Sequence, residues 1–175
     1  LSSCTPKKNN AATRHYQAFI TKYNIYYNGD THFIETLDEM ETKYEDDYSQ
    51  LLFIHPAEAR NNPKAPQPSG SFDRSIEKAQ KAIQLRSITK RPKKKSGKQS
   101  AKYKEWLKRE EYNPFIHNAW MMMGRSQFFN GDFLGAASTF LYTSKRFKWL
   151  PETVMEANLW QARCYCALGW LFETG

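Results

Sequence analysis

The sequence predicts an all-α protein, a tetratricopeptide-like α-solenoid of antiparallel helix pairs with a long Pro-rich connection and an exposed basic loop. Apolar residues recur at steps of three and four over most of the 175 residues, which is the period of an α-helix. Glycine and proline separate these periodic stretches. Towards the end of the chain, four positions repeat at a constant offset of 38 residues. Such a repeat is typical of stacked helix pairs.

Residues 1–11 are predicted to be the tether of a lipid anchor. Leu1-Ser2-Ser3-Cys4 matches the last four positions of a bacterial lipobox, in which the cysteine becomes acylated. The residues that follow are polar and contain no helical pattern. We expect a covalent lipid on Cys4 and no other cofactor; a chance match to the motif is the alternative.

Residues 12–48 are predicted to form a first tetratricopeptide-like hairpin, with helices over 12–28 and 32–46. Asn28-Gly29-Asp30 lies between the two periodic stretches and favours a turn. The first apolar stripe is expected to face the second one across this turn. Its members are Tyr16, Ile20, Tyr23 and Tyr27. The alternative is a stacking platform for sugars or bases, formed by Tyr16, Tyr23, Tyr26 and Tyr27.

The middle of the chain is predicted to hold a Pro-rich connection over residues 49–71, and a helix, a basic loop and a short helix over residues 72–112. Four prolines and Gly70 keep the connection extended. Helices are expected over 73–88 and 101–111. Between them, TKRPKKKSGKQS contains almost no apolar residue and is expected to be exposed.

Residues 113–175 are predicted to hold one tetratricopeptide repeat and the start of a second, with helices over 113–130, 132–147 and 152–169. Gly124 lets a partner helix approach, and Gly131 in Asn-Gly-Asp supplies a left-handed turn. Ala136 and Phe140 are then expected to fold back onto the first helix, against a buried Trp120. The pattern begins again after Pro151, so the chain is expected to be the front portion of a longer repeat protein.

Two arginines occupy the same position in the two repeats and predict a partner-binding surface. Arg125 and Arg163 are 38 residues apart, each directly after a small contact residue. Stacked repeats would bring the two guanidinium groups together, where they suit a carboxylate or an acidic peptide. Phe128 and Phe129 are expected to add apolar area beside them. The alternative is that both arginines pair with acids of this chain.

The net charge of +8 is concentrated in the basic loop. Lys93, Lys94 and Lys95 are consecutive and have basic neighbours on both sides. A run of this kind is usually a solvated loop. An acidic partner, anionic lipid headgroups or nucleic acid are the alternatives.

No residue pattern predicts catalysis or a metal site. The four histidines are isolated in sequence, and the chain has neither a glycine-rich phosphate loop nor a G-x-S-x-G motif. We therefore expect a scaffold and not an enzyme, with no small-molecule substrate and no nucleic acid.

Taken together, four elements resemble the PorW/SprE family, tetratricopeptide lipoproteins of type IX secretion and gliding motility. These elements are Cys4, the KYNIYYNG segment at 22–29, the KAQKAI segment at 78–83 and the AWMMMGR segment at 119–125. The resemblance implies an outer-membrane lipoprotein on the periplasmic side. It also implies a scaffold that bridges the ring-forming lipoprotein complex and the β-barrel translocon of the secretion machine. Only Cys4 carries over as a site residue.

Two alternative functions follow from other features of the chain. One is glycan capture by a lipoprotein resembling SusD, beside a β-barrel transporter; it would require exposed aromatic side chains. The other is nucleic-acid binding through residues 90–104, which would show a strong dependence on salt.

Overall fold

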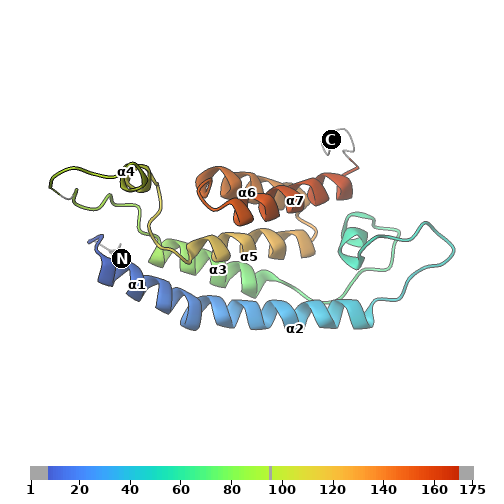
Figure 1. Ribbon diagram of the computed structural model, residues 1–175. Helices are drawn as coiled ribbons and strands as arrows, with labels where there is room; N and C mark the ends of the chain where they lie inside the picture. The colour runs from blue at the N-terminus through green and yellow to red at the C-terminus, as the bar shows by residue number, and fades with distance from the viewer. Residues whose placement is uncertain (1–7, 95, 170–175) are drawn as a thin grey trace.

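The computed structural model describes residues 8–94 and 96–169, and within these ranges the chain is all-helical (Figure 1), which confirms the predicted class. The elements, in order, are α1 (Ala11–Ile20), the π-helical turn η1 (Thr21–Tyr26), α2 (Tyr27–Lys43), the 3-10 helix η2 (Pro56–Asn61), α3 (Asp73–Arg86), α4 (Ala101–Leu107), α5 (Ile116–Phe129), α6 (Phe133–Arg146) and α7 (Pro151–Ala167). The predicted bounds of α3, α6 and α7 agree to within two residues. The helix predicted over 101–111 ends early, at Leu107, and α5 begins only at Ile116.

The helices lie in three layers (Figure 1). The first is one long helix formed by α1, η1 and α2, the second contains α3 and α5, and the third contains α6 and α7. Phenylalanines fill the space between the layers, and five of them are fully or almost fully buried: Phe72, Phe128, Phe133, Phe140 and Phe147. The segment that carries α4 projects at the end where α1 begins, and the connection from α2 to α3 projects at the other end.

The turn between α5 and α6 agrees with the prediction from its glycines. Gly131 has a φ of +83°, which L side chains rarely adopt. Asp132 caps α6, and its Oδ1 accepts a hydrogen bond of 2.9 Å from the Gly135 amide. A Cβ placed on Gly124 would lie 2.7 Å from the ring of Phe140, so this glycine allows the two helices to approach.

The hairpin predicted over residues 12–48 is wrong. The chain is helical without interruption from Ala11 to Lys43, and Asn28-Gly29-Asp30 lies inside that helix. Gly29 is buried against the second layer, where a Cβ would meet Met122 Cε at 2.7 Å and Lys78 Cβ at 3.0 Å. The Ser75 hydroxyl also donates a hydrogen bond of 2.9 Å to the Gly29 carbonyl. Gly29 is therefore a helix-contact residue and not a turn residue.

The segment between α3 and α5 leaves the helical stack and returns to it at a closed base. The amide of Tyr112 donates to the carbonyl of Ile88, 3.0 Å away. Oε1 of the buried Glu111 accepts hydrogen bonds from the amides of Ile88, Tyr112 and Asn113 at 2.7–3.0 Å. These bonds hold both ends of the excursion together, so the basic loop and α4 are presented on a fixed support.

Candidate functional site

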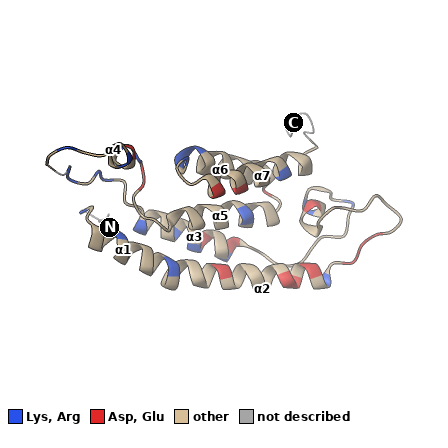
Figure 2. Cartoon of the chain, viewed as in Figure 1, with Lys and Arg blue, Asp and Glu red and all other residues tan. Residues whose placement is uncertain are grey.

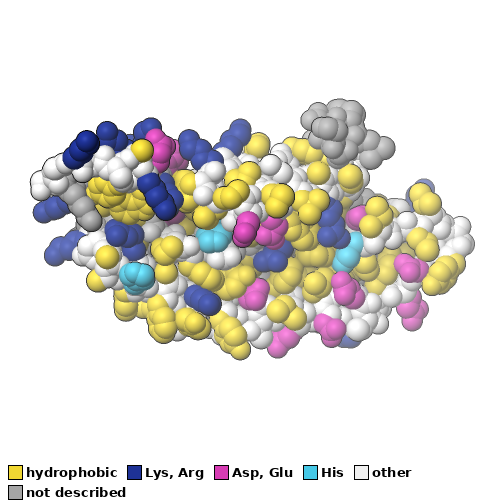
Figure 3. Space-filling view, viewed as in Figure 1, with side chains coloured by type: hydrophobic (Ala, Val, Ile, Leu, Met, Phe, Trp, Pro, Cys, Tyr) yellow, Lys and Arg dark blue, Asp and Glu magenta, His cyan; other side chains and the backbone are white. Residues whose placement is uncertain are grey.

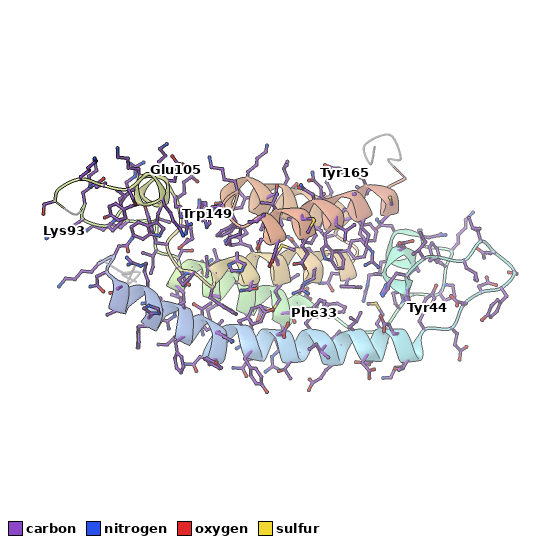
Figure 4. The ribbon with its side chains drawn as sticks, viewed as in Figure 1. Phe33, Tyr44, Lys93, Glu105, Trp149 and Tyr165 are labelled. Carbon is purple, nitrogen blue, oxygen red and sulfur yellow. The ribbon has the colours of Figure 1, made fainter. Side chains whose placement is uncertain are left out.

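Arg125 is half-buried on the side of α5 that faces the long helix. Its guanidinium carbon is 5.6 Å from the ring centre of Phe33, which rises from α2 towards α5 (Figure 4). The Tyr26 phenol lies beside it, and the pKa of this phenol is raised by burial and by Asp30 and lowered by Arg125. The guanidinium is thus held between an aromatic ring and a phenol.

Arg163 is held in a similar way on α7. Its guanidinium carbon is 4.8 Å from the ring centre of Trp160 and 5.0 Å from that of Phe128. His55 is also near: burial lowers the pKa of this imidazole and the charge of Arg163 lowers it further, while Glu41 acts to raise it. His55 Nε2 and Glu41 Oε1 are 3.2 Å apart.

One continuous aromatic cluster supports both arginines. Phe33 contacts Phe129, with ring centres 5.5 Å apart, and Phe128 contacts both Phe129 and Trp160 at 5.4 Å. Phe128 and Phe129 are only 0% and 4% exposed. The prediction that these two side chains offer open apolar area is therefore wrong, because they are core residues beneath the arginines. We call Arg125 and Arg163 with their supporting rings the arginine surface.

Neither arginine forms an ion pair with an acidic side chain of the described residues. The Nε atom of Arg125 is buried and has no hydrogen-bond partner there. Pairing with acids of the same chain, the alternative considered from sequence, therefore does not occur in this part of the molecule. The arginine surface offers two positive groups with fixed positions.

A second site lies at the end of the molecule where α1 begins. It is a cavity of about 820 Å³, which we call the basic cleft. Its lining residues are Lys8, Asn9, Asn10, Ala11, Arg14, Lys90, Arg91, Pro92, Lys93, Tyr103 and Trp106. Five of these are cations and none is acidic. Figure 3 shows dark blue side chains gathered around a yellow patch at this end, and Figure 2 shows acidic residues gathered towards the far end of α2.

Specific hydrogen bonds hold the walls of the basic cleft together. The Asn9 side chain donates to the Lys90 carbonyl at 2.7 Å, and Arg14 donates to Asn9 Oδ1 at 2.6 Å. The Arg14 guanidinium carbon also lies 5.0 Å from the ring centre of Trp106, and Tyr103 stacks on the same ring. Sequence reasoning missed Arg14, Tyr103 and Trp106, because no aromatic residue lies within the basic loop and the fold supplies them from α1 and α4.

Lys93 and Lys94, two of the three consecutive lysines singled out in the basic loop, differ in their relation to the basic cleft. Lys93 lines the basic cleft and is labelled at this end in Figure 4. Lys94 is exposed but is not part of the lining. Lys95 and the predicted lipidation site, Cys4, lie outside the described residues.

The outer face of the long helix carries exposed aromatic side chains, which contradicts the prediction of a buried stripe. Tyr16, Phe19, Tyr23 and Tyr27 are 52–62% exposed, and we call them the aromatic stripe. The buried side of this helix mixes small and polar residues, among them Thr21, Gly29 and Thr36, with the apolar side chains of Ile25, Phe33 and Met40. The periodicity of Tyr16, Tyr23 and Tyr27 therefore indicated the wrong face of the first half of this helix, whereas Phe33 and Met40 in its second half are buried.

No helix among the described residues is both long and apolar enough to cross a membrane. Within the same residues, no three histidine, cysteine, aspartate or glutamate side chains are grouped as metal ligands would be. A scan against protein-family models and a search of curated proteins found no match to this chain.

Proposed function

We propose that this chain belongs to a non-enzymatic scaffold, an outer-membrane lipoprotein of type IX secretion and gliding motility. A lipid on Cys4 anchors it on the periplasmic side of the membrane. Its helices pair in the manner of tetratricopeptide repeats and hold segments of neighbouring proteins. The partners are the ring-forming lipoprotein complex and the β-barrel translocon, which the scaffold connects.

The arginine surface is the observation that carries this proposal. Arg125 and Arg163 sit on α5 and α7, which are first helices of successive pairs in the proposed repeat. Both guanidinium groups stack on rings of one aromatic cluster, and neither forms an ion pair within the described residues. Their side chains are half-buried and rest on aromatic rings of the fold, so less entropy is lost when a partner engages them.

The chemistry of the arginine surface favours an acidic segment of a partner. A planar guanidinium binds a carboxylate through two parallel hydrogen bonds, and partial burial strengthens each charged contact. Two such groups suit a peptide with two carboxylates, or one carboxylate and a chain terminus.

Co-purification from detergent-solubilised outer membranes tests the proposal. The full-length protein should carry translocon and ring lipoproteins with it, and Arg125→Ala should weaken that association by about ten- to a hundredfold, since a hydrogen bond to a charged group contributes about 1.5–3 kcal/mol. Arg125→Lys should restore part of it, because the charge remains but the planar fork is lost. Arg74→Ala is the matched control, since Arg74 is an exposed arginine on α3.

Full partner recovery with Arg125→Ala, in a protein that stays folded, would exclude the arginine surface as the binding site. Recovery of a sugar transporter in place of secretion components would exclude a role in type IX secretion.

The aromatic stripe favours a second candidate, glycan capture by a lipoprotein similar to SusD. Tyr16, Tyr23 and Tyr27 expose more than half of their surface, and aromatic faces are suitable for stacking on sugar rings. A glycan-binding assay on the full-length protein separates the two candidates. Binding that is lost in Tyr16→Ala and Tyr23→Ala variants would favour glycan capture. The absence of binding to any glycan would favour the scaffold function.

A further inference from the structure

The basic cleft has a chemistry that the scaffold function does not use. Lys8, Arg91 and Lys93 are exposed at its rim, and Arg14 is half-buried in its wall. Since no acidic residue lines the cavity, these charges create a local positive potential within it. The amino-terminal end of α1 lies in the same wall and adds the positive end of its helix dipole.

The arrangement of the aromatic residues identifies which kind of anion this site suits. Trp106 already contacts three side chains: Tyr103 is stacked on it, Arg14 lies over its ring, and Tyr112 meets it at an edge. A nucleic-acid base would therefore compete with three side chains for the ring of Trp106, whereas an unobstructed ring is the usual stacking anchor of single-stranded nucleic acid. What remains is a cavity of about 820 Å³ rimmed by cations, which is large enough for several phosphate groups.

The position of the cleft relative to the proposed anchor identifies the source of these phosphates. Lys8 follows Cys4 by four residues, which span roughly 14 Å at full extension. A lipid on Cys4 would thus keep the rim of the cleft close to the headgroups of the membrane. We propose that the basic cleft binds the phosphates of anionic phospholipid headgroups; this inference rests on the proposed lipid anchor.

A second membrane contact would change how the scaffold is held. An acyl anchor by itself fixes a protein to the membrane but leaves its orientation free. A basic cleft bound to headgroups removes that freedom, and it places the amino-terminal end of α1 at the membrane. The arginine surface is then presented at a defined height.

Vesicle binding by the unacylated chain tests the inference apart from the anchor. A Cys4→Ser chain should co-sediment with phosphatidylcholine vesicles that contain phosphatidylglycerol, and it should not do so with phosphatidylcholine alone. Replacing Arg91 and Lys93 by Gln should weaken binding about 25-fold, since each basic residue near an anionic surface contributes about fivefold. Replacing Lys64 and Arg74 by Gln removes the same charge elsewhere and should have little effect; both are exposed.

Equal losses in the two double variants would overturn the proposal, because net charge alone would then explain binding. Release of the protein by inorganic phosphate, but not by chloride at equal ionic strength, would assign the cleft to a soluble phosphate. Tighter binding to a single-stranded oligonucleotide than to the vesicles would assign it to nucleic acid. None of these results affects partner co-purification, and fractionation of the Cys4→Ser protein in cells tests the anchor separately.

Discussion

The same tripeptide, Asn-Gly-Asp, occurs twice in this protein with opposite structures. At residues 130–132 it forms the turn between α5 and α6, with Gly131 at a φ of +83°. At residues 28–30 it lies inside the long first helix, and no break occurs there. Identical local sequences therefore do not determine whether this chain turns.

The surroundings of the two glycines explain the difference. At the turn, Asn130 is held from both sides, because its side chain accepts from the Phe72 amide and donates to Asp73. Gly135 follows at the third helical position, where a Cβ would collide with the capping carboxylate of Asp132. At the corresponding position after Asp30 the chain has Phe33, which is buried in the core.

At residues 28–30, tertiary contacts keep the Asn-Gly-Asp tripeptide helical. Gly29 packs closely against Met122 and Lys78, where a Cβ would lie 2.7 Å from Met122 Cε and 3.0 Å from Lys78 Cβ, and the helix is continuous through this contact. A glycine in a helix costs about 1 kcal/mol relative to alanine, but close packing against a second layer offsets that cost. A turn tripeptide thus acts as a turn only where neighbouring residues complete it.

The largest expected effect comes from replacing the two glycines in parallel. Gly131→Ala should lower the free energy of unfolding by about 1–3 kcal/mol, because the left-handed backbone is strained with any side chain and the new Cβ meets Arg60. Gly29→Ala should cost less than about 1 kcal/mol, since its gain in helix propensity offsets most of the crowding at Met122. Urea unfolding monitored by circular dichroism measures both. The reverse order would show that the glycine at residue 29 is the more constrained one.

A smaller difference in stability is expected between variants of the two aspartates, Asp132 and Asp30. Asp132→Ala removes the cap of α6 and should cost about 1 kcal/mol. Asp30→Ala should change the stability by no more than about 0.5 kcal/mol, because Asp30 is within a continuous helix and caps nothing. The same unfolding experiment compares them, and equal costs would mean that Asp30 also supports a helix end.

The smallest expected effect is on the pH dependence of the free energy of unfolding. Burial and Asp30 raise the pKa of Tyr26 above its ordinary value of 10.0, so folding favours the neutral phenol. The contribution of the neutral phenol to the free energy of unfolding is fully present below pH 10 and decreases as the pH rises above that value. As the pH rises from about 9 to 11, the free energy of unfolding of the Tyr26→Phe variant should therefore fall less than that of the parent protein. Asp30→Asn should bring the titration of Tyr26 towards lower pH in an absorbance measurement, and Asp132→Asn should leave it unchanged.

The contrast between the two tripeptides also explains how far the sequence could predict the fold. Around α5 and α6, Gly124, Gly131 and Phe140 form contacts between residues close in sequence, and the predicted turn and close approach of the two helices were confirmed. The long helix was missed because its buried side mixes the small and polar Thr21, Gly29 and Thr36 with apolar residues, whereas the aromatic residues of its first half face outward. Hydrophobic periodicity cannot identify a buried face of that composition.

Prediction of the candidate sites was limited by distance along the chain. The positions of Arg125 and Arg163 followed from a repeat offset, but the burial of Phe128 and Phe129 beneath them depends on Phe33 and Trp160. The basic cleft depends on the bond from Asn9 to the Lys90 carbonyl, 81 residues apart. Charge patterning identified its lysines, but only the fold shows that Arg14 and Trp106 complete the cavity.

The uninterrupted helix from Ala11 to Lys43 has a mechanical consequence. At 1.5 Å per residue it is a rod of roughly 50 Å, with the basic cleft at one end and the connection towards α3 at the other. Because α3 and α5 are packed along this rod, the stack moves with it as a lever. A tilt of about 10° at the cleft end displaces the far end by about 9 Å, given that length. Had Asn28-Gly29-Asp30 been a hinge, the same tilt would have been absorbed in the middle of the molecule.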